Sequence, residues 1–415
     1  MTDLKQQNDK SFDEACRFII KLGERMHGYG PNAARLEYYL NRITKILGYQ
    51  GIFRSTPDQI IFSFSKDGSD WQNIHISAMH GTGTELNRLA NVGELINEFG
   101  NGKLSIAEAS SRLDKIDKMP HPWGNAATAL AYVLTGAAFP VLLGGSWMDL
   151  IFSGILSLVV FFMVLKSGSW RPLKADWLPL STAFVAGILA AISRYFIPEL
   201  NVVLVTLSAV LILIPGYPIS VGVVEIVSKH INSGLSNLVG GLIYLFKQFA
   251  GGWLGVKAVA LILTIPAATT ATPIDSVWLW VFVPAIIIGL GIALQTPYRD
   301  FIWACLGMLI AFLGTFYGSE WVGVNFGNLL GMVLLVVFTS TWSRKTKRPP
   351  SIVLVPAFIL LVSGSIGFRG LAAFAAGNMQ AGSQEFLQMF IVALTLAAGL
   401  VIGVTLVNPI KKRSE

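Results

Sequence analysis

Charged residues are scarce in this chain. They make up 13% of its 415 residues, while hydrophobic residues make up 53% and the mean hydropathy is +0.60. A soluble globular protein typically carries about 25% charged residues. The composition therefore excludes an ordinary soluble protein and predicts an integral membrane protein in contact with the lipid bilayer.

Cysteine and histidine are also rare, with two and five residues. We expect Cys16 in a soluble core and Cys305 in the membrane, so no disulfide is predicted between them. His75 and His80 would lie on opposite faces of a strand or beyond its end, which does not favour a metal site. We therefore expect neither a metal nor a cofactor.

The signals of several other function classes are missing from the sequence. There is no G-x-x-x-x-G-K-[ST] motif, which argues against a built-in ATPase. There is no G-x-S-x-G or H-E-x-x-H motif, so an enzyme is not predicted. A membrane-anchored enzyme that uses the N-terminal region is kept as a second alternative. The first ten residues are polar, so we expect no signal peptide.

Residues 1–122 have a mixed, polar pattern that predicts a cytoplasmic α+β domain. Ser11 is expected to cap the first helix, and Ser105 with Glu108 predicts a capping box for the last one. Pro120 and Pro122 separate the domain from the rest of the chain. The predicted helices are Phe12–Met26, Pro31–Gly48, Thr84–Phe99 and Ile106–Met119, and the predicted strands are Gly51–Ser55, Gln59–Ser65 and Trp71–Met79.

From Trp123 onward the chain is a series of apolar segments, each close to the ~20 residues that cross a bilayer. They predict a polytopic α-helical membrane protein with about ten transmembrane helices. The fifth is the least regular, because Lys247 lies well inside it. The predicted segments are Asn125–Leu143, Met148–Leu165, Pro179–Ile197, Val202–Val221, Gly240–Thr264, Ser276–Gln295, Arg299–Tyr317, Trp321–Trp342, Ser351–Leu371 and Phe386–Val407.

The charges of the connecting loops predict the orientation. With the N-terminal domain in the cytoplasm, the outer loops contain only Arg194 and Arg369 among the basic residues. This asymmetry follows the positive-inside rule, and it accounts for the net charge of +7 without a nucleic-acid partner. We therefore expect a multi-pass protein of the cytoplasmic (inner) membrane with both termini in the cytoplasm.

Two of the apolar segments are interrupted in similar ways. Pro215–Pro218 interrupts the fourth segment and Ser363–Ser365 the ninth, five segments later. This spacing predicts two five-helix units, residues 123–268 and 273–410. An odd number of helices per unit inverts the second unit relative to the first, which is typical of secondary transporters. Backbone groups freed by such breaks are tolerated only where they are buried in protein or line a wet cavity.

Short motifs form a series along nearly the whole chain. The N-terminal region contains His27-Gly28-Tyr29-Gly30, Arg35-x-Glu37 and Ser55-Thr56-Pro57, and the remainder contains Pro215-Gly216-Tyr217-Pro218-Ile219, Val355-Pro356, Gly364-Ser365 and Arg369-Gly370. In this order they resemble the motifs of the threonine/serine exporter family in its fused, two-half form. Ser363 stands where the family usually has proline, and Glu225 lies near a position where aspartate is common.

The resemblance implies a secondary active exporter of small hydroxy amino acids, threonine and serine, driven by the proton motive force. Some family members are split into two chains and are associated with dicarboxylate export, so an exporter of succinate-like dicarboxylates is the first alternative. The expected partners are a small amino acid or carboxylate substrate and protons. A homo-oligomer is left open.

The candidate pathway residues lie at the two breaks and near them. Arg369 could pair with a substrate carboxylate or extend to the outer interface, and Lys247 would be functional if it lies within the membrane. Glu225 is a candidate for proton coupling, although a solvated loop position is favoured for it. The pathway candidates are Pro215, Gly216, Pro218, Ser363, Gly364, Ser365, Arg369, Lys247 and Asn237.

Three further candidates belong to the motif of the N-terminal domain. His27 could titrate near neutral pH and gate the domain, but a structural histidine is favoured. Arg35 and Glu37 are two positions apart on a helix, so they do not share a face and need not pair.

Overall fold

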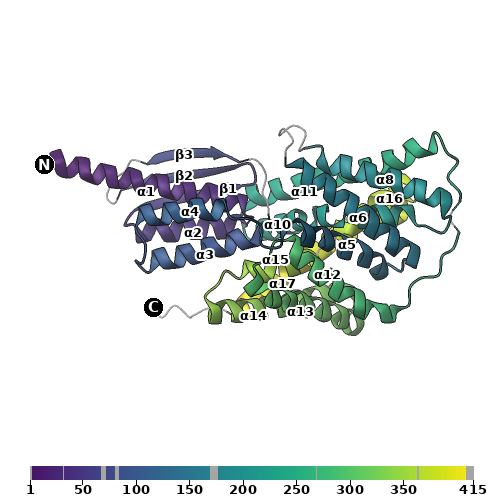
Figure 1. Cartoon of the computed structure of the whole chain (residues 1–415). Coiled ribbons are helices and arrows are strands. Elements are labelled where there is room, and N and C mark those ends of the chain that lie inside the picture. The colour runs from purple at the N-terminus through teal and green to yellow at the C-terminus, as the bar shows by residue number, and fades with distance from the viewer. Residues whose placement is uncertain are drawn as a thin grey trace.

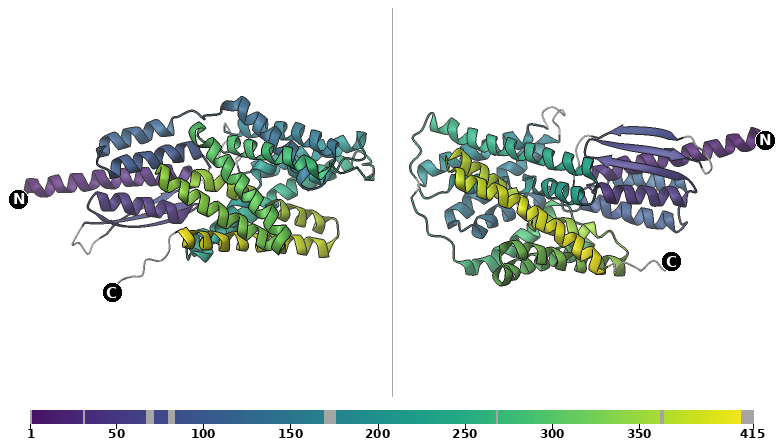
Figure 2. Two further views of the ribbon diagram at one scale, coloured as in Figure 1. Left: turned by 90° about the horizontal axis from the view of Figure 1, so that it is seen from below. Right: turned by 180° about the vertical axis from the view of Figure 1, so that it is seen from behind.

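The computed structural model describes residues 2–30, 32–66, 72–79, 84–168, 176–267, 269–361 and 364–407. It has two parts, a small N-terminal domain and a bundle of long helices (Figure 1). The domain lies at one end of the bundle, as the views from below and from behind also show (Figure 2).

The described part of the N-terminal domain contains four helices and one three-stranded sheet. Phe53 lies opposite Phe62 in the sheet, and both rings are buried in a core with Leu22 and Leu40 of the helices. The sheet is antiparallel in the order β1-β2-β3. The elements are α1 (Thr2–Gly28), α2 (Ala33–Ile46), β1 (Gln50–Thr56), β2 (Gln59–Ser65), β3 (Asn73–Ala78), α3 (Leu86–Gly100) and α4 (Ile106–Asp117).

The predicted helix starts in this domain have mixed outcomes. The capping box is confirmed, because the Glu108 N–H donates to Ser105 Oγ (3.3 Å) and the Ser105 N–H donates to Glu108 Oε2 (2.8 Å). The cap predicted at Ser11 is wrong, since α1 already begins at Thr2. Asn32 caps α2 by accepting from the Arg35 N–H (3.1 Å), while Pro31 lies outside the described residues.

The bundle is built from long apolar helices and two short 3₁₀ turns. Its elements are α5 (Gly124–Leu142), α6 (Trp147–Ser167), α8 (Leu178–Phe196), α9 (Val202–Ala209), η1 (Leu211–Leu213), α10 (Gly216–Val227), α11 (Ile231–Ala260), η2 (Ser276–Trp278), α12 (Leu279–Ala293), α13 (Tyr298–Val322), α14 (Val324–Thr346), α15 (Ser351–Leu361), α16 (Gly364–Ala375) and α17 (Met379–Val407).

The number of membrane spans is only partly settled by these helices. Within the described residues, eight helices are long and apolar enough to cross a membrane. The count rises to nine if α9 and α10, which are bent by 62° at their break, form one span. The predicted fifth span corresponds to α11, which begins at Ile231 rather than Gly240 and is not among the eight. A polytopic helical membrane protein is therefore confirmed, and the ten-span count stays a prediction.

The two halves of the bundle have matching element lengths. Helices α10 and α16 both contain 12 residues, from Gly216 and Gly364. The next helix begins fifteen residues later in both halves, at Ile231 (231 − 216) and Met379 (379 − 364). Each break is therefore followed by a short helix and then a long helix with the same spacing. The inverted relation of the halves stays a prediction.

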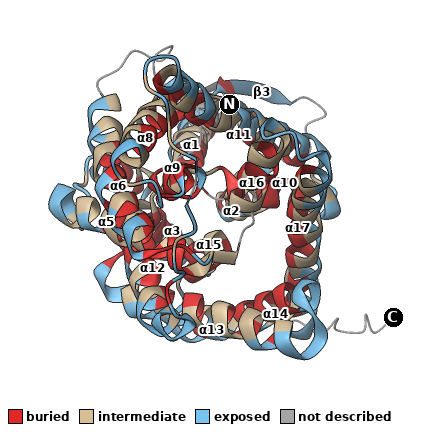
Figure 3. Ribbon diagram, turned by 90° about the vertical axis from the view of Figure 1, so that its right-hand side faces the viewer, coloured by how far each residue is buried: buried red, intermediate tan, exposed pale blue. Residues whose placement is uncertain are grey.

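The broken helices lie on the inside of the bundle. In the view from the end opposite the N-terminal domain, α9, α15 and α16 lie inward of α8, α13, α14 and α17 (Figure 3). Helix α2 of the N-terminal domain is visible behind the centre of this arrangement. The domain thus covers one end of the bundle where the broken helices run.

Candidate functional site

The two helix breaks lie against each other in the centre of the bundle. A β-carbon placed on Gly364 would lie 2.9 Å from Gly216 Cα and 2.5 Å from Ile214 Cγ2. Both glycines are buried, and they are the first residues of α16 and α10. The backbones approach this closely because neither position has a side chain. Ser363 lies outside the described residues, so the contact at the second break is described from Gly364 onward.

At the first break, the first turn of α10 has few free N–H groups. Pro215 and Pro218 have no N–H, and the Gly216 N–H turns back to the Ile214 carbonyl (2.8 Å). The N-terminus of a helix carries a partial positive charge that favours anions. Since α10 and α16 both begin here, two such ends meet in one buried place.

Glu225 lies two turns further along α10 and is only 1% exposed. One carboxylate oxygen accepts from the backbone N–H of Ala33 in α2 (2.9 Å), and the other accepts from Ser233 Oγ and Asn237 Nδ2 of α11, both at 2.8 Å. The favoured expectation of a solvated loop position is therefore wrong, because the loop follows α10 one turn later. The structure brings the candidates Glu225 and Asn237 together and adds Ser233, which the sequence analysis missed.

The motif residues of the N-terminal domain lie near the same junction. His27 is buried, and its Nε2 donates to the Thr56 carbonyl (2.8 Å), while burial lowers the pKa of the ring. Glu37 is buried and accepts from the Ser55 N–H and from Arg54, rather than pairing with Arg35. The geometry of His27 thus fits the structural role that was favoured from the sequence.

Two basic candidates lie outside the central junction. Arg369 forms an ion pair with Glu385 of α17 (2.9 Å), so its guanidinium already has an acidic partner. Lys247 donates to the carbonyl of Asp176 (3.3 Å), just before α8 begins. This contact places the Lys247 ammonium at an end of α8 and not in the interior of the bundle. Ser365, in the first turn of α16, is half-buried.

A cluster of charges joins the N-terminal domain to the second half of the bundle. Glu94 of α3 pairs with Arg299 and, at 2.9 Å, with Arg348. Arg348 also pairs with Asp300, which is 2% exposed. The domain is therefore attached on two sides, to α10 through Glu225 and to the loops around α13 and α14 through this cluster.

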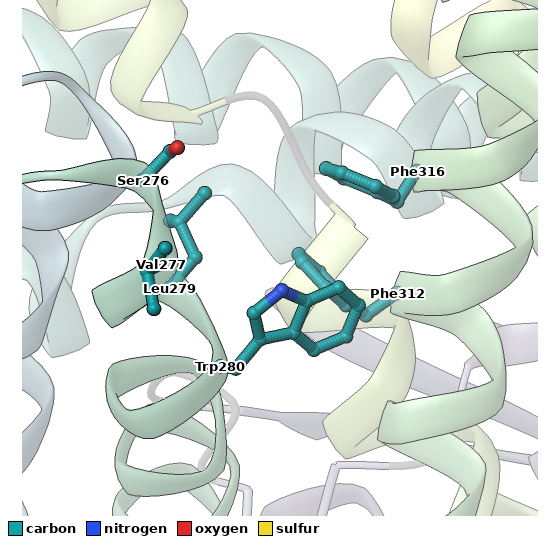
Figure 4. Close-up of a pocket in the computed structure, with 6 residues that line it drawn as sticks. All are labelled: Ser276, Val277, Leu279, Trp280, Phe312 and Phe316. Atoms are coloured by element: carbon teal, nitrogen blue, oxygen red, sulfur yellow. The ribbon is translucent and has the colours of Figure 1, made fainter.

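One pocket leads toward the second break from the end opposite the N-terminal domain. It has a volume of about 440 Å³ and is lined by Thr315, Ser319, Glu320 and Asn328, and by Leu360 and Leu361 at the end of α15. A smaller neighbouring pocket of about 150 Å³ shares Phe312 and Phe316 with it and is also lined by Trp280 (Figure 4). The smaller pocket is almost entirely apolar, so we regard the larger one, whose lining includes four polar side chains, as the candidate entry.

Comparison with known proteins identifies the family. A model of a family proposed to export threonine and serine matches residues 17–259, which is more than half of the chain. A second model, "Threonine/Serine exporter, ThrE", matches residues 278–406. The chain belongs to the threonine/serine exporter family. The resemblance predicted from the motifs is confirmed, and the fused form of the exporter family accounts for two models on one chain.

Several fungal proteins are similar to this exporter-family chain. An uncharacterized protein of Schizosaccharomyces pombe is 23% identical over 96% of the chain and 56% of its own length. Pheromone-regulated membrane protein 10 of Candida albicans is 24% identical over 85% of the chain and 33% of its own length. The protein of the same name from Yarrowia lipolytica is 24% identical over 89% of the chain and 31% of its own length. The chain thus spans about half of these relatives or less. No solved structure matches it.

Proposed function

We propose that the protein is a secondary active exporter of threonine and serine, driven by the proton motive force across the cytoplasmic membrane. The observation that carries this proposal is the contact between the two helix breaks at Gly216 and Gly364. Substrate sites of secondary transporters lie where broken helices of two repeats meet, with helix N-termini directed at anionic groups. A substrate carboxylate would therefore bind at the ends of α10 and α16.

The proposal includes an inverted repeat of two five-helix units. It is supported by the equal lengths of α10 and α16 and by the equal spacing to α11 and α17. If α9 and α10 form one span and α11 another, the eight apolar helices become ten. Ten spans would leave both termini on the cytoplasmic side, as the loop charges predict.

Glu225 is proposed as the proton-coupling group. Its carboxylate accepts three hydrogen bonds, from α2 and from α11, and a proton on it would convert one acceptor into a donor. The bond to the Ala33 N–H joins the N-terminal domain to α10. Protonation would weaken that bond, so proton binding and release of the domain from the cytoplasmic end are coupled in this proposal.

The test is a counterflow assay with the purified protein in liposomes. We expect counterflow of labelled threonine and serine, and with an imposed proton gradient we expect their accumulation against a concentration gradient. Transport of succinate without any amino-acid transport would overturn the proposed substrate and favour the dicarboxylate alternative. Turnover of a substrate by the protein without transport would favour the membrane-anchored enzyme.

A further inference from the structure

A glutamine is buried in the middle of the bundle with its amide unused. Gln248 of α11 is 0% exposed, and neither its Nε2 nor its Oε1 has a hydrogen-bond partner among the described residues. A buried amide without partners is unfavourable, and polar groups in membrane helices usually mark a packing contact or a functional site.

The surroundings of Gln248 follow from its neighbours on the same helix face. Leu245 and Gly252, three residues before and four after it, share that face. Leu245 packs on α16, since its Cδ2 lies 2.8 Å from a β-carbon placed on Gly367. A β-carbon on Gly252 would lie 3.1 Å from Thr206 Cγ2. Gln248 therefore lies on the face of α11 that packs on α8, α9 and α16.

Thr206 of α9 offers a second unused polar group beside the same face of α11. It is 3% exposed, and its hydroxyl has no partner within the part of the chain that the structure describes. Phe368 of α16 also borders the region, 3.8 Å from the β-carbon position on Gly252. Two buried, uncharged polar groups without partners among the described residues thus lie on packed helices, with the Phe368 ring beside them.

We propose that Gln248 and Thr206 form the subsite that recognises the hydroxyl group of the substrate. This inference rests on the proposed function. An amide and a hydroxyl together provide donors and acceptors but no charge, which suits a neutral hydroxyl better than a carboxylate or an ammonium. Leu245 packs on Gly367, one helical turn past Gly364, so the proposed subsite lies beside α16 within a few turns of the break.

The test compares substrates that differ only in the hydroxyl. Counterflow rates are measured for threonine against valine and for serine against alanine, in liposomes containing the full chain. A site that bonds a hydroxyl discriminates strongly against an analogue without it. We expect Gln248→Leu and Thr206→Val to reduce the preference for threonine over valine by about tenfold or more. Thr206→Ser keeps the hydroxyl and should keep the preference.

Thr339→Val provides the matched control. Thr339 is also buried with an unpartnered hydroxyl as far as the described residues extend, but it belongs to α14 in the other half of the bundle. This variant should keep the wild-type preference. If Gln248→Leu does not fold, the comparison of Thr206→Val with Thr206→Ser still tests the subsite.

Two results would overturn the subsite. In the first, the wild type transports threonine but Thr206→Val keeps the same preference over valine, which leaves the proposed function standing. In the second, the wild type transports neither threonine nor serine, which removes the proposed function together with the subsite.

Discussion

Gly216 and Gly364 are in direct contact although they are 148 positions apart (364 − 216), because each begins a half-helix at the same buried place. The contact has a geometric consequence for the substrate pathway. Two helix N-termini that meet can direct their partial positive charges at one anion, which a single kink in a helix cannot do. The packing of this pair should therefore be sensitive to any added side chain.

Gly364→Ala should separate the two breaks. Its β-carbon would lie 2.9 Å from Gly216 Cα and 3.0 Å from Gly216 N, closer than packed atoms allow, and backbone atoms cannot rotate away. We expect a loss of about 1–3 kcal/mol of stability from such overpacking, with loss of transport. Thermal unfolding in detergent and counterflow in liposomes measure the two effects. Gly240→Ala, whose β-carbon would meet nothing within 4 Å, is the control and should leave both unchanged.

Glu225→Gln should uncouple transport from the proton gradient. The neutral amide keeps the shape of the side chain but cannot exchange a proton, and its NH₂ group faces Asn237 Nδ2 as a second donor. We expect threonine counterflow to persist and proton-driven accumulation to be lost, with a stability loss of about 1–3 kcal/mol.

Ser233→Ala is the control for Glu225→Gln. It removes one hydrogen bond to the same carboxylate and keeps the titratable group. Accumulation driven by the proton gradient should therefore survive in Ser233→Ala. If Glu225→Gln still accumulates threonine against a gradient as well as the wild type does, Glu225 is not the coupling group.

Glu94→Gln should loosen the N-terminal domain from the second half of the bundle. Glu94 holds Arg299 and Arg348, and Arg348 is only 15% exposed, so removing the acid leaves a half-buried arginine with one partner fewer. Because Glu94 itself is 28% exposed, we expect a loss of only about 1–2 kcal/mol, below that of a fully buried pair. Limited proteolysis near Pro120 should become faster.

Glu98→Gln is the matched control for the charge cluster. Glu98 lies one turn further along α3 and pairs with Arg112 inside the N-terminal domain. Its loss should leave the proteolysis rate unchanged. Equal rates in Glu94→Gln and the wild type would show that the cluster does not hold the domain in place.

The sequence predicted elements whose signals are local. The strand Gln59–Ser65 depends on the alternation of polar and apolar residues, and the capping box at Ser105 depends on a neighbour three residues away. Both occur where predicted. The breaks were visible because Pro215 and Gly364 interrupt otherwise continuous apolar runs. These features need no knowledge of the tertiary structure.

The surroundings of Glu225 and Gln248 could not be predicted in this way. Glu225 is buried because α2, from the N-terminal domain, places the Ala33 N–H beside it, and this contact joins residues 192 positions apart. Gln248 lies in a helix whose hydropathy falls short of a typical span, so its burial depends on the close packing of α11 on α8. That packing uses glycines, since a β-carbon on Gly251 would lie 2.1 Å from the Leu180 carbonyl oxygen.

His27 makes the stability of the N-terminal domain depend on pH. Burial lowers the pKa of its ring below the ordinary value of 6.5, so the folded domain resists protonation while the unfolded chain accepts a proton. Between the two pKa values the unfolded state binds more protons, and stability therefore falls as the pH drops below about 6.5. The slope is at most about 1.4 kcal/mol per pH unit for one proton.

His27→Gln should remove this dependence, because an amide can still donate to the Thr56 carbonyl but cannot titrate. Thermal unfolding of the full chain from about pH 7.5 to about pH 5 measures the effect. The control is His75→Gln on the exposed face of β3, which should keep the wild-type slope, and an unchanged slope in His27→Gln would assign the dependence to other groups.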